Sequence, residues 1–280
     1  MNETMRRTVL GFVVAWTVAL LTGCETISQD LSDLGEAFSQ PSPSEAARWM
    51  IDLNDAGKRR RGTVLIATSP FGAAESNVEW YRDRVANERD PMVLAVTITA
   101  LARHGEPADA LVITPQLEHE DFKVRWAAAR GLQRLHNRQA IAPLLDRLRR
   151  DETPDVRVAC AEALGQYPED RVFQGLVAAL KARELSVNLA ARDSLQTLTG
   201  ENFELDQRAW LAWYNRPDIG AERAFANQQE YLFPTYTRDV SWMERVAFWA
   251  TPTFETPAPP AGLRPSDERR TYEDSVEEEG

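Results

Sequence analysis

Apolar positions recur along residues 90–198 at a nearly constant interval. A valine begins each copy and a leucine closes it, and both recur at steps of 31, 32 and 31 residues. The valines are Val93, Val124, Val156 and Val187, and the leucines are Leu101, Leu132, Leu164 and Leu195. The residues between them are rich in alanine and place apolar side chains at helical spacing, which predicts one amphipathic helix in each copy.

A second helix is expected after each of the first three helices. Breaks at residues 104–107, 136–137 and 167–168 separate the two helices of a copy. The apolar residues of the second helix are Ile141, Leu144, Leu145 and Leu148 in the second copy, Phe173, Leu176, Val177 and Leu180 in the third, and a poorer set, Ala110, Ile113, Thr114 and Leu117, in the first. One helix pair cannot bury its apolar face alone, so the pattern predicts an all-α fold in which stacked pairs form an α-solenoid.

Irregular segments on both sides of residues 90–198 are expected to cap the solenoid. Residues 45–89 contain a degenerate copy, with helices expected near 55–67 and 77–88. Residues 199–254 begin with Gly200, which can end a helix, and Asp206, which can cap the next helix, where Trp210 and Trp213 share a face. The other aromatic residues of this cap leave two interpretations open, packing against the last repeat or a surface for a partner or a membrane.

The repeated helices are similar to those of a known family. The Val-Arg pair and the alanines of residues 124–132, with a similar helix at 156–164, resemble HEAT repeats of the short bacterial type, which are related to the repeats of phycobilin lyases. The resemblance implies that an aspartate before the Val-Arg pair and the arginine itself link adjacent repeats, roles that fall on Asp155, Arg125 and Arg157. Leu94 and Asn188 replace the arginine in the outer copies, so we expect a discontinuous polar ladder.

A basic head and an apolar run precede the repeats. The run covers residues 8–21, which is shorter than the ~20 residues that cross a bilayer. It ends in Leu21-Thr22-Gly23-Cys24, which resembles the lipobox of bacterial lipoproteins. The resemblance implies that residues 1–23 are a signal peptide, that cleavage occurs between Gly23 and Cys24, and that Cys24 carries acyl chains such as palmitate, which anchor the protein in a membrane. An uncleaved signal anchor with an incidental cysteine is the alternative.

The same resemblance implies export to the cell envelope. Glu25 follows the cysteine where some lipoproteins have aspartate, and this favours the outer membrane over the inner one. Residues 24–44 are then a lipidated tether, in which a short interfacial helix and a loose tether remain open. Residues 255–280 combine prolines with an acidic run, which is typical of a disordered tail.

The net charge and the cysteines bear on how the protein is held at a membrane and on whether it can form a disulfide. The chain has 280 residues and a net charge of −11. Because residues 1–23 carry Arg6, Arg7 and Glu3, a net charge of +1, the remaining chain has −12. We expect such an acidic protein to be held at an anionic membrane surface by its lipid and not by its overall charge. With Cys24 acylated, Cys160 has no cysteine left to pair with, and its apolar neighbours predict a buried thiol.

No catalytic constellation is recognisable in the sequence. The histidines are His104, His119 and His136, and they do not combine with cysteines at the spacing of a metal site. No phosphate-binding glycine loop or nucleophile elbow is present, and the phycobilin-lyase resemblance supplies no catalytic motif. We therefore expect no catalytic residues, no metal and no cofactor. The basic residues 58–61 are expected to be a solvated helix start and not a nucleic-acid site.

Residues 123–150 form a basic section in this acidic chain. They carry eight basic side chains against a single acidic one. Alignment of the second helices by their leucines places Glu118, Arg149 and Lys181 at equivalent outward positions. The candidate partner-binding residues are therefore Arg147, Arg149, Arg150 and Lys181. The alternative is a solvated helix face paired with nearby acids.

These features favour a lipid-anchored, non-enzymatic protein whose solenoid is a scaffold or adaptor for another protein of the cell envelope. An alternative function is binding of an envelope polymer or glycan through the basic section. An accessory enzyme of lyase type is a third and less favoured hypothesis.

Overall fold

The computed structural model describes residues 41–219, 224–225 and 260–263. The chain divides into two compact units, residues 1–45 and 46–280. Only residues 41–45 of the first unit are described, and nearly all of the described residues belong to the second. The predicted signal peptide, Gly23, Cys24 and most of the tether lie outside the described residues, as does most of the aromatic segment after residue 219.

Helices make up most of the described chain. They are α3 (Pro43–Met50), α4 (Ala56–Thr68), α5 (Glu75–Asn87), α6 (Pro91–His104), α7 (Ala110–Ile113), α8 (Phe122–Arg134), α9 (Ile141–Arg150), α10 (Pro154–Leu164), α11 (Asp170–Ala179), α12 (Leu185–Thr199) and α13 (Gln207–Tyr214), with short 3-10 helices η1 (Pro107–Asp109), η2 (Thr114–Glu118) and η3 (Arg138–Ala140). No strand occurs among these residues, and their single β-bridge joins Leu135 to Ala261. The all-α prediction is confirmed.

Side chains placed just before the helices fix where several of them begin. The Asp90 carboxylate accepts hydrogen bonds from the backbone amides of Met92 and Val93, and Pro91 occupies the first turn of α6. Asp206 caps α13 in the same way, as expected from the sequence. A carboxylate at this position satisfies amides that have no partner within the helix, and proline lacks the amide that would be left over.

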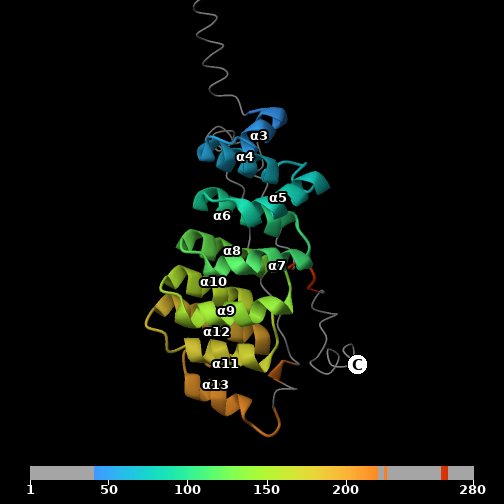
Figure 1. The fold of residues 1–280 in the computed structure, drawn as a ribbon. Helices are drawn as coiled ribbons and strands as arrows, with labels where there is room; N and C mark the ends of the chain where they lie inside the picture. Colours follow the sequence, from blue (N-terminus) through green and yellow to red (C-terminus); the bar gives the residue numbers. More distant parts are fainter. Residues whose placement is uncertain (1–40, 220–223, 226–259, 264–280) are drawn as a thin grey trace, which may run out of the picture. The chain divides into compact units, whose positions relative to one another are not determined.

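The helices stack in two layers. The first helices of successive pairs, α4, α6, α8, α10 and α12, contact one another in that order. The second helices are α5, the broken segment of α7 and η2, α9, α11 and α13, and they form the other layer. Figure 1 shows these pairs following one another from the α4 end to α13. We number them repeats 1 to 5, with α4 and α5 as repeat 1.

The apolar register predicted from the sequence is the core of the array. All four anchor valines and all four closing leucines have no exposed surface. The predicted apolar residues of α9 and α11 are also buried, as are Ala110, Ile113 and Leu117 in repeat 2. Because neighbouring repeats supply the atoms that cover these side chains, the core is continuous along the stack.

Small residues let the helix backbones approach closely. The surface of α8 that meets α6 contains Gly131, where an added Cβ would lie 3.3 Å from the side chains of Ala102 and Ile98. In the other layer, a Cβ on Gly175 would collide with the Leu145 side chain. A larger residue at either glycine would require the neighbouring side chains to shift.

The second helix of repeat 2 differs from the others. The chain forms η1, the single turn of α7 and then η2 instead of one continuous helix. Pro115 lies in the first turn of η2. Proline has no backbone N–H and cannot donate to the carbonyl one turn earlier, so the α-helical ladder stops there. The sequence predicted a second helix here with a poorer apolar set, and it did not predict the break.

Aromatic side chains close the array at α13. The rings of Phe173 and Tyr214 stack with centroids 4.2 Å apart, and those of Phe203 and Trp210 meet edge to face at 5.0 Å. The Tyr214 hydroxyl donates to Asp170 at 2.8 Å, which ties α13 to α11. Gly200, with a φ of 76°, ends α12 in the left-handed conformation that glycine tolerates. The predicted closing element is therefore present, and Phe225 is also buried.

A short piece of the C-terminal region has a defined place. Residues 260–263 lie within the segment that composition marks as a disordered tail, yet they bond to the end of α8. The Ala261 amide donates to the Arg134 carbonyl, and the His136 amide donates to the Ala261 carbonyl, both at 2.7 Å. Composition missed this contact because backbone groups, and not an apolar run, make it.

The leucine register leads to a stability prediction. Leu132→Ala or Leu164→Ala should lower the free energy of unfolding by about 2–5 kcal/mol, because each removes a fully buried side chain and leaves a cavity. Urea unfolding of both variants measures the loss. Leu185→Ala, at a leucine that is 60% exposed, is the control and should cost less than about 0.5 kcal/mol. Equal losses at Leu132 and Leu185 would contradict the register.

Candidate functional site

The array has two edges with different chemistry. Loops between the two helices of one repeat form the hairpin edge, which includes residues 104–107, 135–137 and 165–169. Loops between one repeat and the next form the linker edge, which includes residues 88–90, 119–121, 151–153 and 182–184. Most of the polar side chains singled out in the sequence lie on one of these edges.

An arginine clamp joins successive repeats at the linker edge. Arg125 on α8 donates from Nε and Nη2 to the two carboxylate oxygens of Asp151, at 2.7 and 3.0 Å. Its Nη1 donates to the carbonyls of His119 and Glu120, both at 2.9 Å. The Asp151 side chain is 1% exposed. One guanidinium therefore holds the loop before its own helix and the loop before the next repeat, in the bidentate geometry that arginine favours.

The clamp recurs at two other repeats. Arg157 donates to the Leu148 carbonyl at 2.9 Å and to Glu184 at 2.7 Å. Arg59 bonds Glu88 with two contacts of 3.1 Å. Arg59 belongs to the basic residues 58–61, for which the sequence predicts a solvated helix start. It is partly buried and paired, so that prediction is wrong for this residue.

The ladder is interrupted where the sequence predicted. Leu94 occupies the arginine position in repeat 2 and is buried. Asn188 occupies it in repeat 5, and its Oδ1 atom is buried without a hydrogen-bond partner in the described part of the chain. The predicted role of Asp155 is wrong, because Asp155 is exposed and the partner of Arg125 is Asp151. Asp151 follows the last residue of α9 and is therefore placed by the preceding helix.

The environment of Glu88 favours its ionised form. Burial raises the pKa of this carboxyl group, but the Asp90 amide and the Arg59 guanidinium bond to the carboxylate and together hold the pKa below its ordinary value of 4.5. The Asp90 amide lies 3.0 Å from Oε1. Hydrogen bonds to the charged form outweigh the cost of desolvation here.

The four predicted partner-binding residues lie near the linker edge but differ in availability. Arg147 is only 20% exposed and bonds Glu118 of repeat 2 at 3.0 Å, so it joins repeats. Arg149 and Lys181 are exposed. Arg150 is 72% exposed and pairs with Asp146 at 3.1 Å. The three arginines also lie in the last turn of α9, where positive charge stabilises the helix dipole.

Neighbouring repeats supply acids to the basic section. Arg130 pairs with Glu162 of repeat 4, and Arg138 pairs with Glu169 at 2.9 Å. Arg125 and Arg147 also have carboxylate partners. The sequence count of eight bases against one acid therefore overstates the local charge, because the balancing carboxylates come from other segments of the chain. A strongly positive surface is not what this section forms.

The hairpin edge is held by hydrogen bonds between repeats. Asn137 donates its side-chain amide to the Pro107 carbonyl at 3.0 Å and its backbone amide to the Tyr167 hydroxyl at 3.1 Å. The His136 ring stacks on Tyr167 with centroids 4.8 Å apart, and its Nδ1 lies 3.0 Å from Gln166 Oε1. Burial raises the pKa of Tyr167 to about 12, so its hydroxyl stays protonated at neutral pH. These side chains join repeats 2, 3 and 4.

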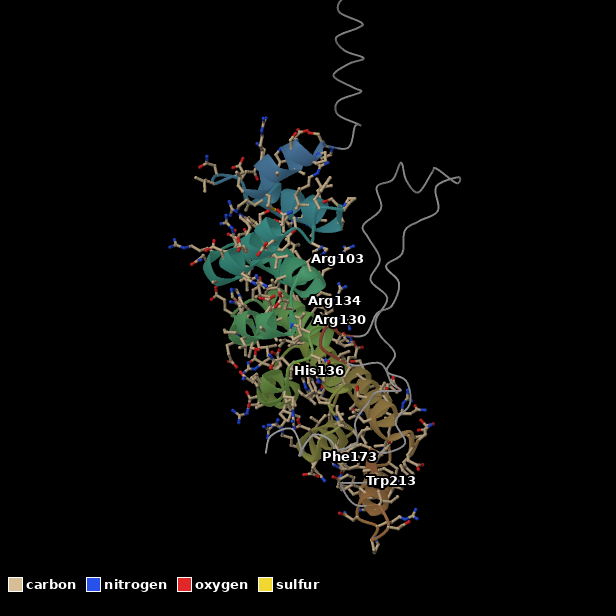
Figure 2. The ribbon with its side chains drawn as sticks, turned by 90° about the vertical axis from the view of Figure 1, so that its right-hand side faces the viewer. Arg103, Arg130, Arg134, His136, Phe173 and Trp213 are labelled. Carbon is tan, nitrogen blue, oxygen red and sulfur yellow. The ribbon has the colours of Figure 1, made fainter. Side chains whose placement is uncertain are left out.

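Figure 2 shows the array turned by 90° about the vertical axis from the view of Figure 1. Arg103, Arg134 and Arg130 succeed one another, with His136 beyond them and Phe173 and Trp213 near the far end. Arg103 and Arg134 are both near the ends of first helices, α6 and α8.

Residues with catalytic potential are used in structural contacts. His104 bonds the Ala67 carbonyl at 2.7 Å, and His119 accepts from the Asp121 amide at 3.0 Å. Cys160 is fully buried, and its burial raises the pKa of the thiol, so the unreactive protonated form is favoured. Within the described ranges, no group of three or more His, Cys, Asp or Glu side chains is placed to hold a metal ion. Nor is any described helix long and apolar enough to cross a membrane.

The repeat geometry agrees with a sequence-family match. Residues 110–196 match the model for HEAT repeats. The described residues form an all-α HEAT-repeat array. The matched residues cover the central repeats, where the period is most regular. No curated protein sequence matches the chain.

Solved structures with similar helical arrays include engineered and natural proteins. One engineered protein is 17% identical, with a TM-score of 0.46, over 67% of this chain and 96% of its own. A second engineered protein is 19% identical, with a TM-score of 0.44, over 67% of this chain and 98% of its own. The complex of CpcE and CpcF of phycocyanin lyase from Nostoc sp. PCC7120 is 19% identical, with a TM-score of 0.38, over 68% of this chain and 83% of its own. These are distant similarities.

The arginine clamp leads to a second stability prediction. Asp151→Asn should lower the free energy of unfolding by about 3 kcal/mol, because it leaves the partly buried Arg125 without a counter-charge. Denaturant unfolding measures the change. The control is Asp193→Asn, whose carboxylate beside Arg192 is 61% exposed, and it should cost less than about 1 kcal/mol. A loss below about 1 kcal/mol at Asp151 would show that the clamp contributes little.

The depressed pKa of Glu88 leads to a pH prediction. The ionised carboxylate stabilises the fold above the ordinary pKa of 4.5, and this contribution is lost as the pH falls through the lower pKa of the folded state. Glu88→Gln should therefore be less stable than wild type at neutral pH, and the difference should shrink below pH 4.5. Unfolding curves across this range test it, with the exposed Glu152→Gln as control. A difference that stays constant down to the lowest pH would contradict the assignment.

Proposed function

We propose that this protein is a non-enzymatic, lipid-anchored HEAT-repeat scaffold of the cell envelope that binds another protein. The lipobox-like sequence ending at Cys24 supports the anchor, and Glu25 favours the outer membrane. HEAT repeats are commonly protein-interaction scaffolds. Stacked helix pairs give the anchored protein an extended surface, and this is the form of surface that solenoids use for binding.

Exposed apolar side chains on the first-helix layer carry this proposal. Phe122 and Trp126 are one turn apart on α8, and each is 43% exposed. Arg130 follows one turn later, with its guanidinium 5.9 Å from the Trp126 ring centroid. Met92 on α6 and Leu185 on α12 are also exposed. Tryptophan, phenylalanine, methionine and arginine are enriched in protein interfaces, and an aromatic pair with an adjacent arginine has the composition of an interaction hot spot.

Cross-linking in living cells tests both parts of the proposal. We expect the wild-type chain to enrich one envelope protein, which mass spectrometry identifies. Cys24→Ser should release the chain from the membrane fraction and reduce this enrichment. Phe122→Ala combined with Trp126→Ala should abolish the enrichment but leave the chain in the membrane fraction. The matched control is Leu111→Ala on α7, at a leucine that is 48% exposed in the other layer. Enrichment that survives the aromatic double substitution would contradict the proposed surface.

Binding of an envelope polymer or glycan is the second candidate. The exposure of Arg149, Arg150 and Lys181 favours it, although Asp146 and Glu118 offset the charge of this group. It predicts salt-sensitive retention on anionic wall polymer that Arg149→Glu combined with Arg150→Glu removes. Co-purification of wall fragments alone, without an enriched partner protein, would favour polymer binding over the scaffold function. An accessory enzyme of lyase type would instead require a chromophore or substrate to co-purify with the protein.

A further inference from the structure

The end of α8 differs from the ends of the other first helices. Helices α4, α6, α10 and α12 each end with a backbone amide of the capping residue bonded to a carbonyl within the helix. The capping residue of α8, Leu135, is extended, with φ and ψ of −114° and 109°, and makes no such bond. The last carbonyls of α8 therefore need partners from outside the helix.

Other segments supply those partners. The Gln166 side chain donates to the carbonyls of Leu132 at 3.2 Å and Gln133 at 3.3 Å. The next carbonyl, that of Arg134, accepts from the Ala261 amide at 2.7 Å, and the His136 amide donates back to the Ala261 carbonyl at 2.7 Å. One residue of the C-terminal region thus exchanges two backbone hydrogen bonds with the hairpin edge, as an added strand does at a sheet edge.

The shape of the contact selects a particular peptide. The Leu263 amide donates to the Pro260 carbonyl at 2.9 Å, which closes a four-residue turn. Gly262 has a φ of +89° at the third position of that turn, where type II turns require glycine. An added Cβ at Gly262 would lie 2.7 Å from Pro107 Cγ and 3.2 Å from the His136 carbonyl oxygen. Pro260 is buried, and Ala261 packs against the core.

We propose that the hairpin edge around Pro107 and residues 134–136 is a peptide-binding site for a Pro-Ala-Gly-Leu turn. The chain's own residues 260–263 are its resident ligand, and a partner segment with the same turn binds by displacing them. The site selects glycine at the third position of the turn, because a side chain there would collide with Pro107. It also requires a backbone amide that donates to the Arg134 carbonyl and a carbonyl that accepts from the His136 amide. Covalent attachment gives the resident segment an effective concentration on the order of millimolar, so an external peptide competes at a disadvantage.

This peptide site is separate from the aromatic surface on α8. It rests on the proposed scaffold function only in that a partner protein would use the site. A defined peptide tests the site directly, whereas cross-linking in cells tests the scaffold. The two proposals can therefore fail independently.

The experiment uses the full chain with Gly262→Val. This substitution should undock residues 260–263, because valine resists a positive φ and its side chain would meet Pro107. The substituted residue lies outside the helices, so the array should remain folded. We expect hydrogen exchange at the His136 amide to become at least about tenfold faster, since its acceptor leaves. The control is Leu263→Val, which keeps the backbone contacts and the glycine.

A peptide titration then measures the vacated site. The probe is an unlabelled peptide with the sequence of residues 256–266, followed by NMR shifts of the backbone amides at positions 136 and 137. We expect the peptide to bind Gly262→Val with a Kd on the order of 0.1 mM, and to bind wild type about tenfold more weakly because the resident segment competes at an effective concentration on the order of 1 mM. The same peptide with valine at the glycine position should not bind. Unchanged exchange at His136, no peptide binding to Gly262→Val, equal affinity for the two chains, or binding of the valine peptide would each overturn the proposal.

Discussion

A single helix pair of this chain has no core of its own. Its valines and leucines point toward the pairs above and below, and they lose contact with water only when those neighbours are present. Stability therefore depends on contacts between repeats, as in other solenoids, where each repeat interacts mainly with its nearest neighbours. This constraint explains why small residues occupy the helix surfaces that meet and why both ends of the series need a different closing element.

Polar contacts between the stacked repeats fix their positions relative to one another. At the linker edge, each arginine clamp bonds a carbonyl from the segment before its own helix and a carboxylate from the next linker, so it joins adjacent repeats. At the hairpin edge, Asn137 and Gln166 do similar work by reaching into neighbouring repeats. The ionisable groups in these contacts are paired and largely shielded from solvent. Among the described residues, the aromatic pair on α8 and the side chains of Arg149 and Arg150 at the end of α9 stay exposed.

The proposed anchor and the proposed binding surfaces together describe a tethered binding protein. A lipid anchor would hold the chain at a membrane, and the array would present a fixed set of side chains to a partner. Binding through Phe122 and Trp126 would use large, rigid rings that lose little conformational entropy on association. Binding at the hairpin edge would use backbone groups and the shape of a turn. The two surfaces recognise different chemistry, so one partner could engage both or two partners could bind side by side.

The sequence by itself determined the helical register, because the period of valine and leucine is a local pattern that any stacked arrangement of these helices must bury. It also determined the interruption of the ladder at Leu94 and Asn188, since neither side chain can replace a guanidinium. Tertiary structure decided the rest. The partner of Arg125 is Asp151 and not Asp155, because the end of the preceding helix, and not the distance along the chain, places the carboxylate. Part of the charge of the basic section is offset by Glu118, Glu162 and Glu169, which come from other segments and are invisible to a local charge count. The docking of residues 260–263 on α8 could not be predicted, because it depends on backbone groups that become available only when the helix ends without a cap of its own.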